Sequence, residues 1–202
     1  MKIDPPHSAE KAELRDYFSN ARRALSDDQY RQYSQEICRQ LLSYLIDLKS
    51  EQPSAIHLHL FLPIEAQREV DLRPLLPHLW QYNIRVAVPR VKQGALEHIP
   101  LTAETKLKTS RWGIPEPTED YNPLTEEEIN SITTVITPLL TCDIKGHRVG
   151  YGGGFYDQFF KTYPHLIKIG VGFFPPIEKI LDSYPGDIPL DYYLYPKELI
   201  RF

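Results

Sequence analysis

Apolar residues recur along the chain at two spacings, one typical of helices and the other of strands. Between Ala9 and Leu25 the spacing is helical, so that Leu14, Phe18 and Ala21 share one face with Leu25. A second, longer helix is predicted from Ser26 to about residue 49. It begins with capping-box chemistry, and its apolar stripe indicates a face buried in the core; the stripe is Tyr30, Tyr33, Ile37, Leu41, Tyr44, Leu45 and Leu48.

Strict alternation from Ser54 to Leu62 predicts a strand. One face carries Ile56, Leu58 and Leu60, and the other carries His57, His59 and Phe61. The two histidines have a spacing that two metal ligands can use. A metal site needs a complete set of ligands and no third one lies nearby in the sequence, so we favour a structural role for this pair.

The rest of the chain alternates between helical and strand patterns. Helices are expected at 71–82, 125–130 and 155–163, and strands at 84–88, 96–101, 132–140 and 166–173. Pro89 is expected to stop the strand before it, and Thr125 with Glu128 has the spacing of a capping box. This alternation predicts an α/β fold: a three-layer α/β/α arrangement with a largely parallel sheet, in one domain spanning 1–202.

Composition and charge limit the classes of partner. The 202 residues are 42% hydrophobic and 25% charged, which suits one domain with a sizeable core. A net charge of -4 and a pI of about 6.0 argue against a general nucleic-acid or anionic-membrane surface. We therefore expect small molecules as partners, no nucleic acid or membrane, and a monomer.

Nothing in the pattern predicts secretion or membrane insertion. The segment Met1 to Glu10 contains charges and prolines in place of an apolar core, and no run approaches the ~20 apolar residues of a membrane span. Cys38 and Cys142 lie far apart and have no metal-like spacing. Buried free thiols in a reducing cytoplasm are the simplest interpretation, and a cytoplasmic location follows from it.

Glycines cluster in one stretch, from Gly146 to Gly154, which holds five of the ten in the chain. Such a loop lets several backbone N–H groups approach one anion. Arg148 adds a fork of donors suited to phosphate oxygens, and Asp157 adds an oxygen ligand suited to Mg²⁺. With a predicted strand before it and a predicted helix after it, the loop has the usual parts of a phosphate site.

Two standard phosphate motifs do not fit this loop. A Walker loop needs Gly-Lys followed by Ser or Thr, and the dinucleotide fingerprint counted from Gly150 needs a glycine where Phe155 stands. The residues alone leave two interpretations open. The stretch is either a phosphate-binding loop of another kind or a tight surface turn whose glycines only permit positive φ.

Other positions carry candidate chemistry, each with a structural alternative. Lys11 and Arg15 lie one turn apart on the first helix, as a cationic pair for a site or as a solvated flank. Glu69 stands just before the next predicted helix. Its carboxylate either interacts favourably with the dipole of that helix or points into a cleft beyond the preceding strand. Trp112 lies in a stiff loop, where it can stack on a planar ligand or fill the core.

Five segments, taken in order, carry a family resemblance. They are Lys11-Ala12-Glu13-Leu14-Arg15, Phe61-Leu62-Pro63 through Glu69-Val70-Asp71, Trp112-Gly113-Ile114-Pro115-Glu116-Pro117, Arg148-Val149-Gly150-Tyr151-Gly152-Gly153-Gly154-Phe155-Tyr156-Asp157, and Asp187 to Asp191. Together they resemble the 5-formyltetrahydrofolate cyclo-ligase family over nearly the whole chain. Because independent segments agree, the phosphate-binding interpretation of the glycine loop is favoured.

The resemblance implies an ATP- and Mg²⁺-dependent ring closure. The formyl oxygen of 5-formyltetrahydrofolate takes the γ-phosphoryl group of ATP, N10 attacks the activated carbon, and 5,10-methenyltetrahydrofolate, ADP and phosphate result. Such chemistry asks the protein mainly for positioning and for charge neutralisation. No residue has to act as a nucleophile.

The resemblance also assigns residues to ATP and the metal. Lys11, Arg15 and Arg148 are the expected catalytic cations. ATP is expected to contact these three and the rest of the loop: Val149, Gly150, Tyr151, Gly152, Gly153, Gly154, Phe155 and Tyr156. Asp157 and Asp191 are the expected Mg²⁺ contacts, with Asp187 as the alternative to Asp191.

On the folate side, Glu69 resembles the family's pterin-binding acid, because a carboxylate accepts paired hydrogen bonds from an amino-pyrimidine edge. The other expected substrate contacts are Leu62, Trp112, Tyr151 and Tyr156. Alternatively, Tyr156 has only a structural role and packs against the start of the helix.

This chain departs from the family pattern inside the loop. Tyr151 and Gly153 replace an Arg and a Lys that some members carry, which puts more weight on Arg148 and the first helix. Two other functions stay open. One is a sugar-phosphate isomerase or CoA-transferase-like enzyme on the same fold, and the other is a non-catalytic folate-binding protein.

Overall fold

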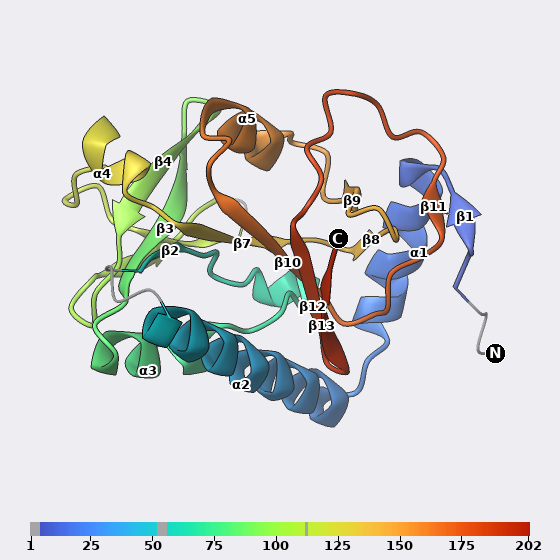
Figure 1. Ribbon diagram of the computed structural model, residues 1–202, viewed down its shortest axis with the longest axis horizontal. Coiled ribbons are helices and arrows are strands. Elements are labelled where there is room, and N and C mark those ends of the chain that lie inside the picture. Colours follow the sequence, from blue (N-terminus) through green and yellow to red (C-terminus); the bar gives the residue numbers. More distant parts are fainter. Residues whose placement is uncertain (1–4, 52–55, 112) are drawn as a thin grey trace.

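A seven-stranded sheet forms the centre of the computed structural model, which describes residues 5–51, 56–111 and 113–202 (Figure 1). The strand order is β13-β12-β10-β7-β2-β3-β4. The strands are β2 (His57–His59), β3 (Arg85–Lys92), β4 (Ala95–Pro100), β7 (Thr134–Pro138), β10 (Ile167–Val171), β12 (Tyr192–Tyr195) and β13 (Glu198–Arg201). The five inner strands are parallel, and β4 and β13 close the edges in antiparallel fashion. The predicted α/β class with a largely parallel sheet is confirmed.

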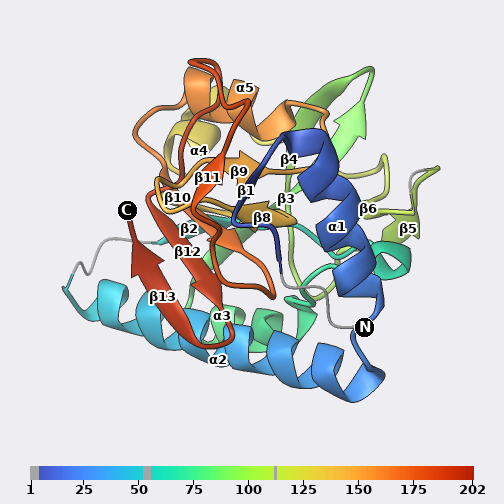
Figure 2. The same ribbon diagram turned by 90° about the vertical axis from the view of Figure 1, so that its right-hand side faces the viewer.

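Helices cover both faces of this sheet, giving three layers (Figures 1 and 2). On one face lie α2 (Asp27–Glu51) and α3 (Leu76–Gln81), and on the other α4 (Glu126–Asn130) and α5 (Phe155–Thr162). Successive residues of a strand point to opposite faces. Accordingly Ile136 of β7 packs with the cluster under α2, whereas Val135 packs with the cluster under α5.

The first helix, α1 (Lys11–Arg23), lies beside the sheet and not on it (Figure 2). Leu14 and Phe18 pack with Val149 and Ile180 in a separate small core. The strands β1 (Ser8–Ala9) and β11 (Lys179–Ile180) pair in parallel next to the helix start, and β8 (Thr141–Cys142) pairs with β9 (Arg148–Val149). The chain's beginning is thereby joined to segments that follow the glycine loop.

Two predicted capping boxes are confirmed. Ser26 Oγ accepts from the Gln29 N–H at 3.1 Å, and the Gln29 side chain accepts from the Ser26 N–H at 3.0 Å. Thr125 and Glu128 make the same reciprocal pair before α4. These boxes satisfy N–H groups that a helix start leaves without partners, so they fix where the two helices begin.

The expected helix at 71–82 is shorter than predicted. Glu65–Gln67 (η1) and Arg73–Leu75 (η2) are 3₁₀ turns, and α3 begins only at Leu76. The Asp71 side chain accepts the Arg73 N–H at 3.0 Å, and Pro74 follows with no N–H to donate. This local turn competes with a regular helix start.

The prediction that Pro89 ends its strand was wrong. β3 continues to Lys92 and pairs with β4 along its length, with Pro89 opposite His98. β2 pairs only with residues 85–87 of β3, so a residue at 89 needs hydrogen bonds on one side only. A proline is tolerated at such a position. A small hairpin, β5 (Leu107–Thr109) with β6 (Pro115–Pro117), follows β4.

The remaining sequence expectations concern the membrane and the thiols. No helix in the described part of the chain is long and apolar enough to cross a membrane. Cys38 and Cys142 are buried free thiols, as predicted. Burial raises the pKa of Cys38 to about 12, with Asp71 adding to the shift, so this thiol is unreactive at neutral pH.

Candidate active site

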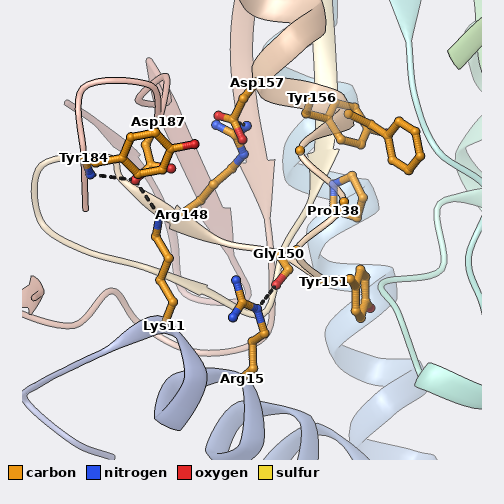
Figure 3. A pocket seen from close by; sticks show the side chains of 14 residues that line it. Lys11, Arg15, Pro138, Arg148, Gly150, Tyr151, Tyr156, Asp157, Tyr184 and Asp187 are labelled. Atoms are coloured by element: carbon orange, nitrogen blue, oxygen red, sulfur yellow. Dashed lines mark hydrogen bonds and ion pairs between the residues drawn. The ribbon is translucent and has the colours of Figure 1, made fainter. Parts of the chain in front are cut away.

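The glycine loop borders a pocket of about 310 Å³, lined by residues 150–157 and by side chains of α1 and of the segment before β12 (Figure 3). The sequence suggested that the loop follows β7 directly. Instead, the β8–β9 hairpin lies between β7 and the loop. Gly154 adopts φ 67° as the N-cap of α5, and Gly152 has φ 93°. Both are left-handed conformations that favour glycine.

Four consecutive backbone N–H groups at this loop have no acceptor. In the part of the chain that the structure describes, the N–H groups of Tyr151, Gly152, Gly153 and Gly154 make no hydrogen bond. They lie at the start of α5, where the helix dipole also favours an anion. The loop therefore has the donors that a phosphate group requires.

Arg148 is held firmly at the back of the pocket. Its guanidinium donates to Asp157 Oδ1 at 2.7 Å and to the Ile188 carbonyl at 2.5 Å, and it lies 5.2 Å from the Phe160 ring centroid. Its side chain is 8% exposed. Burial lowers the pKa of Arg148 from its ordinary value while Asp157 opposes the shift, and the group remains a cation.

Lys11 and Arg15 enter the pocket from α1 (Figure 3). Lys11 Nζ pairs with Asp187 at 2.5 Å, and Arg15 Nε donates to the Gly150 carbonyl at 2.9 Å. The Lys11–Asp187 pair is mostly shielded, with side chains 13% and 12% exposed. The two cations therefore do not form a solvated flank: with Arg148 they give three positive groups around one pocket.

The structure separates the two aspartates expected to contact Mg²⁺. Asp157 lines the pocket, but Asp191 does not: its carboxylate binds Lys168, at 2.8 Å from Nζ and 2.7 Å from the backbone N–H. Lys168 and its strand draw Asp191 toward the sheet. Asp187 lines the pocket in its place and accepts the Tyr184 N–H at 3.0 Å.

Asp143 organises the turn before the loop, and sequence reasoning missed it. It is 1% exposed and accepts the N–H groups of Lys145, His147 and Ile180 at 2.9, 3.0 and 3.2 Å. Three donors compensate a buried carboxylate for its lost hydration. The signal available in the sequence was an acid three residues before Gly146 in a turn.

The expected folate contacts lie at different depths. Glu69 is 3% exposed, and its Oε2 accepts the Ile64 N–H at 2.7 Å. Burial raises the pKa of Glu69, which the Ile64 hydrogen bond opposes. Leu62 is 3% exposed within the main core. Trp112 lies outside the described residues.

Two aromatic residues of the loop have different surroundings. Tyr156 lines the pocket, and its buried hydroxyl has no hydrogen-bond partner among the described residues. Phe155 packs over Gly153, where an added Cβ would lie 2.9 Å from the ring. Val149 is fully buried against α1, so only its backbone is near the loop.

The histidines of β2 form polar contacts inside the protein. His57 Nδ1 lies 3.0 Å from Ser131 Oγ, and His59 Nε2 lies 3.1 Å from His98 Nδ1. The described residues contain no group of three or more His, Cys, Asp or Glu side chains arranged to hold a metal. The structural role favoured for this pair agrees with these contacts.

Comparison with known proteins supports the resemblance. The model of the 5-formyltetrahydrofolate cyclo-ligase family matches residues 7–174. The chain belongs to this enzyme family. Its relatives include the 5-formyltetrahydrofolate cyclo-ligase of Escherichia coli, 27% identical over 186 residues, with 88% of this chain and 96% of the relative covered. That of Haemophilus influenzae is 26% identical, with 91% and 96% covered.

Solved structures of family members share the fold. The 5,10-methenyltetrahydrofolate synthetase of Aquifex aeolicus superposes with a TM-score of 0.74 at 27% identity, covering 95% of this chain and 92% of that one. The enzyme of that name from Mycoplasma pneumoniae gives a TM-score of 0.72 at 22% identity, covering 94% and 100%. The match over nearly the full length of both chains places the glycine loop within the family fold.

Proposed function

We propose that this protein converts 5-formyltetrahydrofolate to 5,10-methenyltetrahydrofolate at the expense of ATP, with release of ADP and phosphate. The formyl oxygen attacks the γ-phosphorus as ADP leaves. N10 then attacks the formyl carbon and loses its proton, and the carbon–oxygen bond breaks to release phosphate, which takes up that proton. Names of the relatives and structural neighbours support this substrate and product.

One observation carries the proposal: three cations and four unpaired N–H groups surround a single pocket. The loop N–H groups would hold the phosphates of ATP, and Arg148 would stabilise charge that develops during transfer. Arg148 is already fixed by Asp157 and Ile188, so little reorganisation is needed when substrate binds. Lys11 would exchange Asp187 for a phosphate oxygen.

The pocket also suits Mg²⁺, which usually binds one or two carboxylates together with substrate phosphates and water. Asp157 Oδ2 and Asp187 Oδ1 have no hydrogen-bond partner among the described residues, while the other oxygen of each is occupied. These two residues would hold the ion, which would neutralise phosphate charge. Glu69 would bind the pterin ring.

The test follows the absorbance of the methenyl product when 5-formyltetrahydrofolate and Mg-ATP are added. Wild-type protein should form product only with ATP. Lys11→Met should lower kcat/KM about 10²–10³-fold, because a positioned charge that stabilises the transition state is lost. Lys108→Met removes a half-exposed lysine from β5 and should behave like the wild type. Folded wild-type protein that forms no product would contradict the proposal.

A further inference from the structure

Two buried opposite charges lie behind Tyr151 and do not touch each other. Arg22 on α1 is 4% exposed and Glu69 is 3% exposed. No ion pair joins them within the described residues, since the hydroxyl of Tyr151 lies between them. Arg22 Nη2 donates to this hydroxyl at 2.5 Å, and the guanidinium lies 5.6 Å from the ring centroid.

Part of the hydrogen-bonding capacity of this cluster is unused. Arg22 Nε is buried and has no partner among the described residues. Glu69 accepts the Ile64 N–H at Oε2, and its carboxylate also hydrogen-bonds the Tyr151 hydroxyl. A buried donor without an acceptor costs free energy. A ligand that supplies an acceptor to Arg22 and donors to Glu69 would remove that cost.

An amino-pyrimidinone ring presents this combination along one edge. Its exocyclic amine and adjacent ring N–H are two donors, which a carboxylate accepts together, and its C4 carbonyl beside them is an acceptor. Glu69 alone matches the two donors. The unpaired donor on Arg22 matches the carbonyl.

We propose that Arg22 and Glu69 together bind the amino-pyrimidinone edge of the folate, with Arg22 donating to the C4 carbonyl. The Tyr151 hydroxyl lies between the two charges, where that edge would bind, and withdraws when substrate binds. This assignment rests on the proposed function, and adds to it a specificity-determining residue and a displaceable side chain.

Tyr151 is suited to such a movement. It stands between Gly150 and Gly152, and the residue is 44% exposed, so part of it already faces solvent. Figure 3 shows it on the far side of Gly150 from Lys11 and Asp187. Since Tyr151 belongs to the glycine loop, its displacement by folate would move a residue next to the phosphate donors.

The experiment compares equilibrium binding of 5-formyltetrahydrofolate and of its 4-amino-4-deoxy analogue, in which the C4 acceptor becomes a donor. The glutamine amide of Arg22→Gln can donate to the C4 carbonyl or accept from the 4-amino group. The preference for 5-formyltetrahydrofolate over the analogue, measured as the ratio of the two Kd values, should therefore fall about tenfold relative to the wild type. Arg23→Gln changes the exposed neighbour, whose hydrogen bonds within the described residues stay inside α1, and should keep the wild-type ratio. An unchanged ratio in folded Arg22→Gln would overturn the assignment.

A second variant tests the displacement of Tyr151 without changing the charge of Arg22 or Glu69. Tyr151→Phe keeps the ring and removes the hydroxyl, so 5-formyltetrahydrofolate should bind several-fold more tightly because nothing has to be displaced. Equal or weaker binding would overturn the displacement. These outcomes are separate from the proposed function, which fails if the wild-type protein forms no product; failure of the wild type to bind 5-formyltetrahydrofolate would overturn both.

Discussion

At the scale of single residues, the positive groups of the pocket are already engaged by the protein. Arg148 and Lys11 each bind an aspartate, and Arg15 binds a loop carbonyl. Such contacts hold long side chains in place, which would lower the entropy cost of binding the proposed ATP. Arg148 has a second anchor in the Ile188 carbonyl, whereas the Lys11 side chain is held by Asp187, so we expect the Lys11 pair to be the one that a bound phosphate rearranges.

Glu69 illustrates a conflict between stability and binding. Because burial raises its pKa, the ionised carboxylate is less favourable in the folded than in the unfolded protein. Glu69→Gln should therefore raise the free energy of unfolding at pH 7, while weakening 5-formyltetrahydrofolate binding about tenfold or more. Urea unfolding and ligand titration measure the two effects.

The control for this prediction is Glu119→Gln, which alters an exposed acid near Lys108 and should change neither quantity appreciably. A loss of stability in Glu69→Gln would contradict the prediction, since it would mean that the charged form contributes to folding.

The residue types of the site could be predicted from the sequence because they follow one another closely in segments. The family resemblance pointed to Lys11, Arg15, Arg148 and Asp157, and all four line one pocket. It named Asp191 as the second metal contact, with Asp187 as the alternative. Of these two only Asp187 lines the pocket, because Asp191 binds Lys168, a residue of another strand. Arg22 carried no signal at all, since nothing in the helix pattern distinguishes it from a solvated arginine.

At the scale of elements, the hairpin before the glycine loop depends on Gly146. It has φ 81°, and an added Cβ would lie 2.8 Å from the Leu190 carbonyl oxygen and 2.9 Å from the Phe202 ring. Leu190 N–H also donates to the Gly146 carbonyl at 2.9 Å. The turn is thus packed tightly against the segment that leads into β12.

A matched pair of glycines tests this packing. Gly94, in the turn between β3 and β4, has φ 82° with nothing near the position of an added Cβ. Gly94→Ala should cost about 1 kcal/mol from backbone strain alone, whereas Gly146→Ala should cost at least about 2 kcal/mol more because the backbone must move. Chemical denaturation of both variants measures the difference. Equal losses would contradict the packing argument.

Element types were predictable where the local pattern agreed with the tertiary environment. Capping boxes fixed the starts of α2 and α4 from short-range chemistry alone. The prediction that the strand ends at Pro89 failed because a proline is tolerated there only if β2 does not extend beside it. How far β2 extends is a property of the sheet. The short α3 was missed because Asp71 makes a local turn that competes with a helix start.

At the scale of the whole molecule, buried histidines join the sheet to α5. His59 and His98 meet between β2 and β4, and the Phe159 ring of α5 stacks on His98 with centroids 4.2 Å apart. Burial lowers the pKa of His98 to about 4, and burial followed by Arg85 lowers that of His57 to about 4. The folded protein therefore keeps these rings neutral.

The stability of the protein should depend on these histidines at mildly acidic pH. The unfolded chain takes up protons near the ordinary histidine pKa of 6.5, and the folded chain does so only near 4. Between these values the unfolded state binds more protons, so the free energy of unfolding should fall as pH is lowered from 6.5 to 4. Urea titrations across this range measure the slope.

Carboxylates also make stability fall at acidic pH, so histidine variants are needed to isolate the contribution of the buried histidines. His57→Gln should reduce the slope between pH 6.5 and 4, while His165→Gln, at an exposed position after α5, should leave it unchanged. A slope in His57→Gln equal to that of the wild type would contradict the assignment.

The pairing of β1 with β11 has a consequence for the order in which this protein matures during synthesis. The N–H of Lys11 donates to Asp182 at 2.8 Å, and its side chain binds Asp187. Lys11 thus waits for Asp182 and Asp187, which are made much later in the chain, before α1 is held at the loop. While the chain is still on the ribosome, α2 can associate with β2, β3, β7 and β10, but the pocket is complete only after residue 187 has emerged. A nascent chain that has not yet reached residue 187 therefore lacks part of the lining that the proposed reaction requires.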